Sequence, residues 1–186
     1  MRYEELTIEG RNAVIEAFRS GKTIDRVFIL DNCQDGPIMT IKREAKKTDC
    51  LIKYVSRERL DQMSETGKHQ GVIAYAAAYE YAQVEDILKL AEEKQEPPFL
   101  ILLDNIEDPH NLGAIIRTAN LAGAHGVIIP KNRAVGLTAA VARTSAGALN
   151  YTPVAKVTNL VKTMEELKRK GCGLSVRIWT GRGCMI

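Results

Sequence analysis

Several residue classes and patterns are scarce or absent in this chain of 186 residues. Aromatic residues make up only 5% of it, and its four cysteines include no C-x-x-C pair. Because no histidine cluster accompanies them, the cysteines predict neither a zinc site nor a disulfide framework. They fit a reducing compartment instead. We therefore expect a cytoplasmic protein that binds no metal.

Long apolar runs and targeting signals are missing as well. The longest apolar run, at residues 99–103, is far too short to span a bilayer, and acidic residues at positions 4, 5 and 9 interrupt any signal-peptide core. No membrane contact is predicted. The net charge of +3 is too small to indicate nucleic-acid binding by itself, and the basic excess lies in residues 156–186.

The first part of the chain predicts a small α/β domain at residues 1–77. Its elements, from apolar periodicity and turn residues, are a helix at about 9–21, a strand at 27–30, a basic helix at 37–47, a strand at 51–55, a short helix at 56–64 and a strand at 72–76. Residues 78–98 are acidic, carry a helical pattern and end in two prolines, so we interpret them as a linker.

The second domain is expected at residues 99–186. Its pattern predicts strands at 100–104 and 126–130 and helices at 111–122, 136–144 and 158–170. Strands that alternate with helices at this spacing favour βαβ units, and hence an α/β domain with a parallel sheet.

The loop between the first strand and helix of this domain holds the most informative residues. Asp104 ends the strand, His110 and Asn111 lie in the loop, and Arg117 follows two turns into the helix. In open α/β sheets, ligands bind where strands end and helices begin. The free N–H groups of a helix start and the forked guanidinium of Arg117 both suit a phosphate.

Plainer roles are open for each of these residues. Asn111 before a helix is commonly a simple N-cap, a loop histidine such as His110 is commonly solvated, and Arg117 could pair with Glu107 or Asp108. Gly113 within the helix costs about 1 kcal/mol relative to Ala, which indicates a close approach by a strand or a substrate.

The same segment resembles a known signature. Asn111-x-Gly113-x-x-x-Arg117-Thr118 is similar to the first signature of the SpoU/TrmH family of RNA ribose 2′-O-methyltransferases. Further similar segments occur in order: Glu9–Val14, His69–Val72, Leu103–Gly113, Ala119–Ala124, Val127–Pro130 and Thr144–Ala148. The first two resemble the substrate-binding domain of the RlmB-like branch, which methylates a guanosine of 23S rRNA. The resemblance covers residues 7 to about 170.

The resemblance implies a chemistry. S-adenosyl-L-methionine is the family's cofactor, RNA is the substrate, full-length relatives form homodimers, and the catalytic domain is of the α/β-knotted class. Asn111 would shape the active site, and Arg117 is the residue implicated in activating the ribose 2′-hydroxyl. Because arginine stays protonated, phosphate anchoring and stabilisation of the developing alkoxide is easier to defend for Arg117 than general-base catalysis.

Other residues resemble positions that contact RNA in the family. Arg11 and Asn12 begin the first predicted helix, and the alternative is a plain surface pair. Arg143 and Ser145 fall in a segment similar to a loop near the active site, and helix termination is the alternative. His110 is a further candidate RNA contact. The helix at 37–47 has a basic face that either binds phosphates or is merely solvated; its members are Lys42, Arg43, Lys46 and Lys47.

Two later family signatures, which build the knot and most of the cofactor pocket, do not occur in the chain, so the cofactor-binding residues are unknown. If the codons of residues 178–180 are read in a shifted frame, they permit Met-Asp, and the codons of residues 183–186 then permit Met-Tyr-Asp. Relatives carry a similar stretch at this point. We therefore expect residues 172–186 to be a frameshifted tail, and the catalytic domain to lack its C-terminal knot. We expect no tight cofactor binding and an inactive chain. The alternative function is a non-catalytic RNA- or ribosome-binding module.

Overall fold

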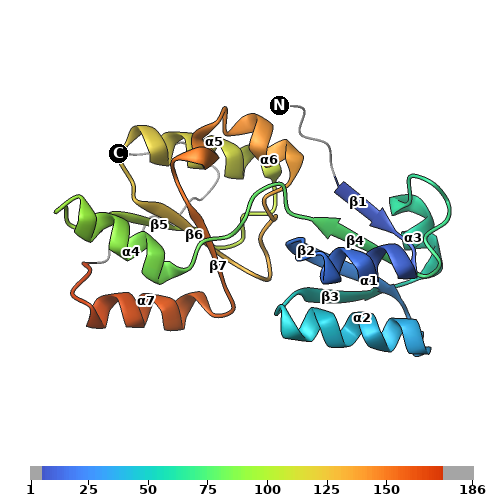
Figure 1. Cartoon of the computed structure of the whole chain (residues 1–186). Coiled ribbons are helices and arrows are strands. Elements are labelled where there is room, and N and C mark those ends of the chain that lie inside the picture. The colour runs from blue at the N-terminus through green and yellow to red at the C-terminus, as the bar shows by residue number, and fades with distance from the viewer. Residues whose placement is uncertain (1–5, 174–186) are drawn as a thin grey trace.

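The structure of the chain is a computed structural model that describes residues 6–173. These residues form two α/β units, which lie side by side in Figure 1. The segment interpreted above as a frameshifted tail lies outside the described residues from position 174 onward.

The first unit is built on a mixed four-stranded sheet in the order β1-β4-β2-β3. β4 pairs antiparallel with β1 and β2, and β3 joins the other side of β2 in parallel. The strands are β1 (Leu6–Glu9), β2 (Ile24–Leu30), β3 (Leu51–Val55) and β4 (Val72–Ala76). The helices are α1 (Arg11–Arg19), α2 (Gly36–Lys47) and α3 (Arg57–Met63).

The core of this unit lies between the sheet and the helices α1 and α2. Val14 and Phe18 of α1 and Ile41 of α2 are buried against Val27 and Ile29 of β2. Side-chain caps fix where two of the helices begin. The carboxylate of Asp35 accepts a hydrogen bond from a backbone N–H of α2, and the hydroxyl of Ser56 does so for α3, as its sequence predicts.

The second unit is built on a parallel sheet in the order β5-β6-β7. Its strands are β5 (Leu100–Leu102), β6 (Gly126–Pro130) and β7 (Val154–Val157). Its helices are α4 (Val84–Glu93), α5 (Pro109–Leu121), α6 (Ala139–Thr144) and α7 (Leu160–Arg169), and a 3₁₀ turn, η1, covers Ala148–Asn150. The predicted α/β class, with a parallel sheet in the second domain, is confirmed.

Helices cover both faces of this sheet (Figure 1). On one face, Leu112 and Ile116 of α5 and Val141 of α6 pack on Val127 and Ile129 of β6. On the other face, residues of α4 and α7 pack on the alternate residues of β6 and β7; the buried members are Ile87, Leu88, Ile128, Ala155 and Leu167. Because both faces are covered, every residue of β6 is buried, as is typical of parallel sheets.

The segment predicted to be a linker, residues 78–98, packs against the second unit rather than running free. Its helix α4 approaches β6 so closely that a Cβ on Gly126 would lie 2.7 Å from Ile87 Cδ1. Apolar residues at helical spacing therefore give α4 its place in the core. The division of the chain into residues 1–77, 78–98 and 99–186 stays a prediction.

Two strands and several helix ends differ from the sequence analysis. β1 and β7 each have only four residues, and Lys156 interrupts the apolar run of β7, so neither stood out as a strand. The helix predicted from residue 136 begins at Ala139, because the Thr138 hydroxyl caps it by accepting a hydrogen bond from the Val141 N–H. No helix among residues 6–173 combines the length and apolarity needed to cross a bilayer.

Candidate functional site

The start of α5 is set by Asp108 and not by Asn111. The Asp108 carboxylate accepts a hydrogen bond of 2.7 Å from the Asn111 N–H, and Pro109 occupies the first turn. The prediction that Asn111 is the N-cap is therefore wrong, because the helix begins two residues earlier than expected. Asn111 lies one turn into the helix with an exposed side chain, and none of the described residues makes a hydrogen bond to its amide.

Arg117 is exposed on α5. Within residues 6–173, no carboxylate pairs with its guanidinium, so the alternative of a clamp to Glu107 or Asp108 does not occur there. An arginine that forms no internal ion pair keeps its forked donors available to an external anion such as phosphate. Arg117 therefore has the exposure that a ligand contact requires.

His110 and Gly113 lie where α5 meets α6. The Nδ1 atom of His110 lies 3.3 Å from the Thr144 hydroxyl. A Cβ on Gly113 would lie 2.6 Å from Thr144 Cβ and 3.0 Å from the Val141 carbonyl oxygen. The close approach inferred for Gly113 is thus made by a helix, and not by a strand or a substrate. His110 stays exposed at the edge of this helix pair.

Arg143 and Ser145 lie at the end of α6 and differ in exposure. Arg143 is exposed in the last turn, whereas Ser145 is the fully buried C-cap. The Ser145 hydroxyl donates to the Ala142 carbonyl, which is the helix termination considered above as an alternative. RNA contact by these two residues stays a prediction, and the surface position of Arg143 suits it better.

The two RNA-binding candidates in the first unit, Arg11 and Asn12, also differ in their contacts. Arg11 forms an ion pair of 2.7 Å with Asp35, and its Nε donates to the Gln70 carbonyl at 3.0 Å. These contacts tie the start of α1 to two loops, which is a structural task. Asn12, in contrast, is exposed, and no residue in the described part of the chain hydrogen-bonds its side chain. Asn12 is therefore the freer of the two to meet a ligand.

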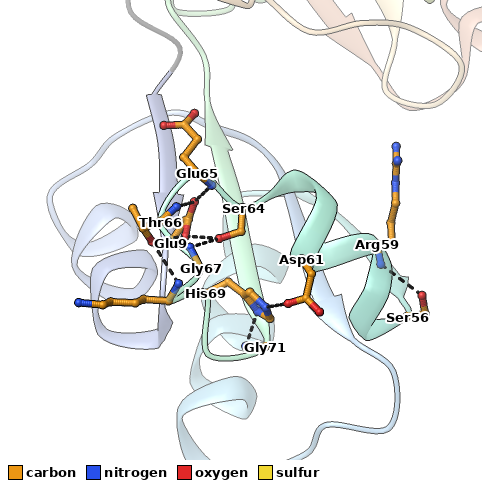
Figure 2. Close-up of polar contacts among 11 residues, drawn as sticks. Glu9, Ser56, Arg59, Asp61, Ser64, Glu65, Thr66, Gly67, His69 and Gly71 are labelled. Carbon is orange, nitrogen blue, oxygen red and sulfur yellow. Dashed lines mark hydrogen bonds and ion pairs between the residues drawn. The ribbon is translucent and has the colours of Figure 1, made fainter.

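A carboxylate network that the sequence analysis did not identify holds the loop at residues 64–67 (Figure 2). Glu9 accepts hydrogen bonds from the Ser64 hydroxyl at 2.7 Å and from the Thr66 hydroxyl and the Glu65 N–H at 2.5 Å. Partial burial raises the pKa of Glu9, but the hydrogen bonds from Thr66, Ser64 and the backbone outweigh it and hold the pKa at about 2. Glu9 was noted only as part of a motif.

His69 anchors the other end of this loop. Its Nδ1 accepts a hydrogen bond of 3.0 Å from the Gly71 N–H, so the proton is on Nε2, which lies 2.9 Å from the Asp61 carboxylate (Figure 2). The imidazole is buried. The motifs Glu9–Val14 and His69–Val72 meet in space, because the Gly10 N–H donates to the Val72 carbonyl and Arg11 donates to the Gln70 carbonyl.

The basic residues of α2 also differ in whether they have partners within the chain. Lys42 donates to the Cys33 carbonyl and lies 5.0 Å from the centre of the exposed Tyr54 ring, whereas Lys47 pairs with Glu44 of its own helix. Arg43 also lies 3.4 Å from the Glu44 carboxylate, and Lys46 is exposed. This face is therefore only partly free to meet phosphates.

Two clefts lie between the units, and they include neither Asn111 nor Arg117. The larger, of about 550 Å³, is lined among others by Asp49, Lys131 and Lys156. These lysines are already neutralised by carboxylates. Neither cleft is lined by a residue of α5. The part of the chain that the structure describes also holds no group of His, Cys, Asp or Glu side chains suited to a metal ion.

Two family models match the chain. One, described as RNA 2′-O ribose methyltransferase substrate binding, matches residues 7–82. The other, described as the SpoU rRNA methylase family, matches residues 98–181. The second match extends past residue 170, near which the motif resemblance ends.

Curated proteins are similar over most of the chain. The TrmH family protein YacO of Bacillus subtilis, named for tRNA/rRNA methyltransfer, is 52% identical over 162 residues, which are 87% of this chain and 65% of YacO. A TrmH family protein of Staphylococcus haemolyticus with the same kind of name is 43% identical over 168 residues, 90% of this chain and 67% of that protein. The chain thus spans about two thirds of their length.

Solved structures are more distantly similar. An AdoMet-bound rRNA methyltransferase of Sinorhizobium meliloti is 23% identical, with a TM-score of 0.40, over 88% of this chain and 57% of that protein. The SpoU methyltransferase AviRb of Streptomyces viridochromogenes, solved with AdoMet, is 18% identical, with a TM-score of 0.42, over 90% of this chain and 59% of AviRb.

Proposed function

The chain belongs to the SpoU/TrmH family of RNA methyltransferases, and from this membership we propose that it serves the methylation of a ribose 2′-hydroxyl in RNA. S-adenosyl-L-methionine is the methyl donor of the proposed reaction. The proposed substrate is a guanosine of 23S rRNA, and the proposed assembly is a homodimer. The substrate follows from the RlmB-like motifs of the first unit, and the homodimer is the assembly that the family resemblance implies for full-length relatives.

Exposure of Arg117 is the observation that carries this proposal. The residue lies two turns into α5, whose start is capped by the Asp108 carboxylate. A phosphate on the exposed face of α5 would meet a guanidinium that no described residue neutralises. Held in that way, the ribose next to the phosphate has its 2′-oxygen within reach of Arg117, whose charge stabilises a developing alkoxide.

The two clefts between the units do not suit the cofactor. The larger is lined by Lys131 and Lys156, which carboxylates already neutralise, and neither cleft includes a residue of α5. We therefore propose that residues 6–173 supply the RNA side of the reaction and do not by themselves form the cofactor pocket. We further propose that the 186-residue chain binds RNA without completing the transfer.

RNA binding tests the role of Arg117. Arg117→Ala should weaken the affinity for a large-subunit rRNA fragment about tenfold and lower the salt dependence by about one ion, because one phosphate contact is lost. Arg19→Ala is the matched control, since Arg19 is exposed and pairs with Glu16 on its own helix. Equal losses for both variants, or none for Arg117→Ala, would overturn the proposed contact.

Methyl transfer tests the reaction. The chain is incubated with rRNA fragments and S-adenosyl-L-methionine that carries a radioactive methyl group, and the RNA is analysed for 2′-O-methylated nucleosides. Transfer to a ribose that Arg117→Ala abolishes would establish the reaction and overturn the proposed inactivity. Transfer to a base would overturn the reaction class.

A non-catalytic RNA-binding module is the second candidate function. The absence of α5 residues from both clefts favours it, because binding of RNA needs only α5 and the first unit. Tight RNA binding with no transfer to any nucleoside would support this candidate for the 186 residues.

A further inference from the structure

A buried cluster of charged and polar side chains lies between the two units. Asp25 of β2 is only 8% exposed. Its carboxylate accepts a hydrogen bond of 2.6 Å from the Tyr81 hydroxyl and pairs with the Lys156 ammonium of β7. Since the Lys156 side chain is 9% exposed, both charges are removed from water. Each unit therefore contributes one charge to a pair that neither could bury alone.

Tyr81 links this ion pair to the backbone of the second unit. Its hydroxyl oxygen accepts a hydrogen bond of 2.9 Å from the Leu137 N–H, and the Lys156 Nζ lies 5.0 Å from the centre of its ring. Burial and the neighbouring Asp25 charge raise the pKa of Tyr81 well above its usual value. The phenol therefore stays protonated, and its O–H donates a hydrogen bond to the Asp25 carboxylate.

Gly136 makes room for the Asp25 carboxylate. A Cβ at this position would lie 1.7 Å from Asp25 Oδ2, so any larger residue would collide with the buried charge. Arg26, the next residue of β2, donates from Nη2 to the Ala134 carbonyl at 3.1 Å. Two features of the loop after β6, the Ala134 carbonyl and Gly136, are thus adjusted to β2 of the other unit.

We propose that Asp25, Tyr81 and Lys156 form a latch that fixes the angle between the two units. Removing one partner of a buried ion pair is unfavourable, and the hydrogen bonds within such a pair are directional. The pair therefore favours one arrangement of the two units, even though desolvation of the two charges offsets much of their attraction. The three residues position the first unit relative to α5 and touch no reacting group. The latch does not depend on the proposed methylation.

Breaking the latch should separate the units. In Asp25→Ala, the Lys156 ammonium and the Tyr81 hydroxyl lose their shared acceptor, so the melting temperature of the full chain should fall by roughly 6–20 °C. Small-angle X-ray scattering below that temperature should show a larger radius of gyration, because the units swing apart. Asp31→Ala, which removes an exposed carboxylate of the same unit, should change neither quantity. A lower melting temperature with an unchanged radius would overturn the latch and leave only a local core defect.

A double variant tests the fit of Gly136. Gly136→Ala alone should open the units as Asp25→Ala does, because the new methyl group displaces the carboxylate. In the Asp25→Ala background the colliding atoms are gone, so Gly136→Ala should add almost nothing to the radius of gyration or to the loss of melting temperature. Additive effects would contradict the proposal.

Tyr81→Phe is the milder variant should Asp25→Ala not fold. It removes one oxygen and keeps the ring beside Lys156, so a smaller rise in radius of gyration is expected. A variant that folds like the parent with no change in the scattering curve would count against the latch.

Discussion

Two arginines show how environment separates residues of the same type. Arg11 and Arg117 both belong to motifs that resemble family signatures. Arg11 is held by Asp35 and by the Gln70 carbonyl, whereas no described residue neutralises Arg117. The motif alone predicts a ligand contact for both, and only the long-range partners decide which one is free.

Glu9 makes acid stability depend on one carboxylate. Its pKa is held at about 2, below its ordinary value, so the unfolded chain binds this proton first as the pH falls. The stability from Glu9 is therefore present above about pH 4.5 and is lost progressively down to about pH 2. We expect Glu9→Gln to be less stable than the parent at pH 7 and nearly equal to it near pH 2.

Urea unfolding at a series of pH values measures this difference. Glu16→Gln is a suitable control, because Glu16 is exposed and pairs only with Arg19 on the same helix. If the difference in free energy of unfolding between the parent and Glu9→Gln stays constant from pH 7 to pH 2.5, the hydrogen bonds in Figure 2 do not act through the charge of the Glu9 carboxylate.

The first turn of α5 illustrates capping at the scale of an element. Since Asp108 satisfies the Asn111 N–H, Asp108→Ala should lower the free energy of unfolding by about 1 kcal/mol. Asn111→Ala should change it by less than about 0.5 kcal/mol, because the exposed amide has no partner among residues 6–173. Thermal unfolding of the two variants compares them directly, and a larger cost for Asn111→Ala would restore Asn111 as the structural cap.

The α5–α6 contact depends on Gly113. Gly113→Ala gains helix propensity but places a methyl group 2.6 Å from Thr144 Cβ, so we expect a net loss of about 1–2 kcal/mol. Gly36→Ala is the control, since nothing lies within 4 Å of a Cβ at the start of α2. Equal unfolding midpoints for the two variants would mean that α6 moves away from the added methyl group at little energetic cost.

Elements with a strong period were predictable from the sequence, and short ones were not. The apolar run of β6 and the spacing of α2 and α5 fix their type, because a covered strand and an amphipathic helix each leave a distinct pattern. β1 and β7 are too short to leave one. The start of α5 was available from the Asp108-Pro109 pair, which is typical of an N-cap followed by the first helical residue.

At the scale of the whole molecule, the contacts between units lay beyond the reach of sequence reasoning. Asp25, Tyr81, Gly136 and Lys156 are far apart in the chain, and no local period links them. The same holds for the candidate site: the motifs identify Asn111 and Arg117 as candidates, but the burial of Ser145 follows from packing of α6. The proposed latch is the prediction that belongs to this scale.

The pairing of β1 with β4 sets an order of events during synthesis. Leu6 lies opposite Ala76, so the first strand has no partner until about 70 further residues have left the ribosome. At about 5–20 residues per second, that wait is roughly 4–14 s. Nascent β1 therefore stays unpaired for this time, and the sheet of the first unit is complete only after β4 has emerged.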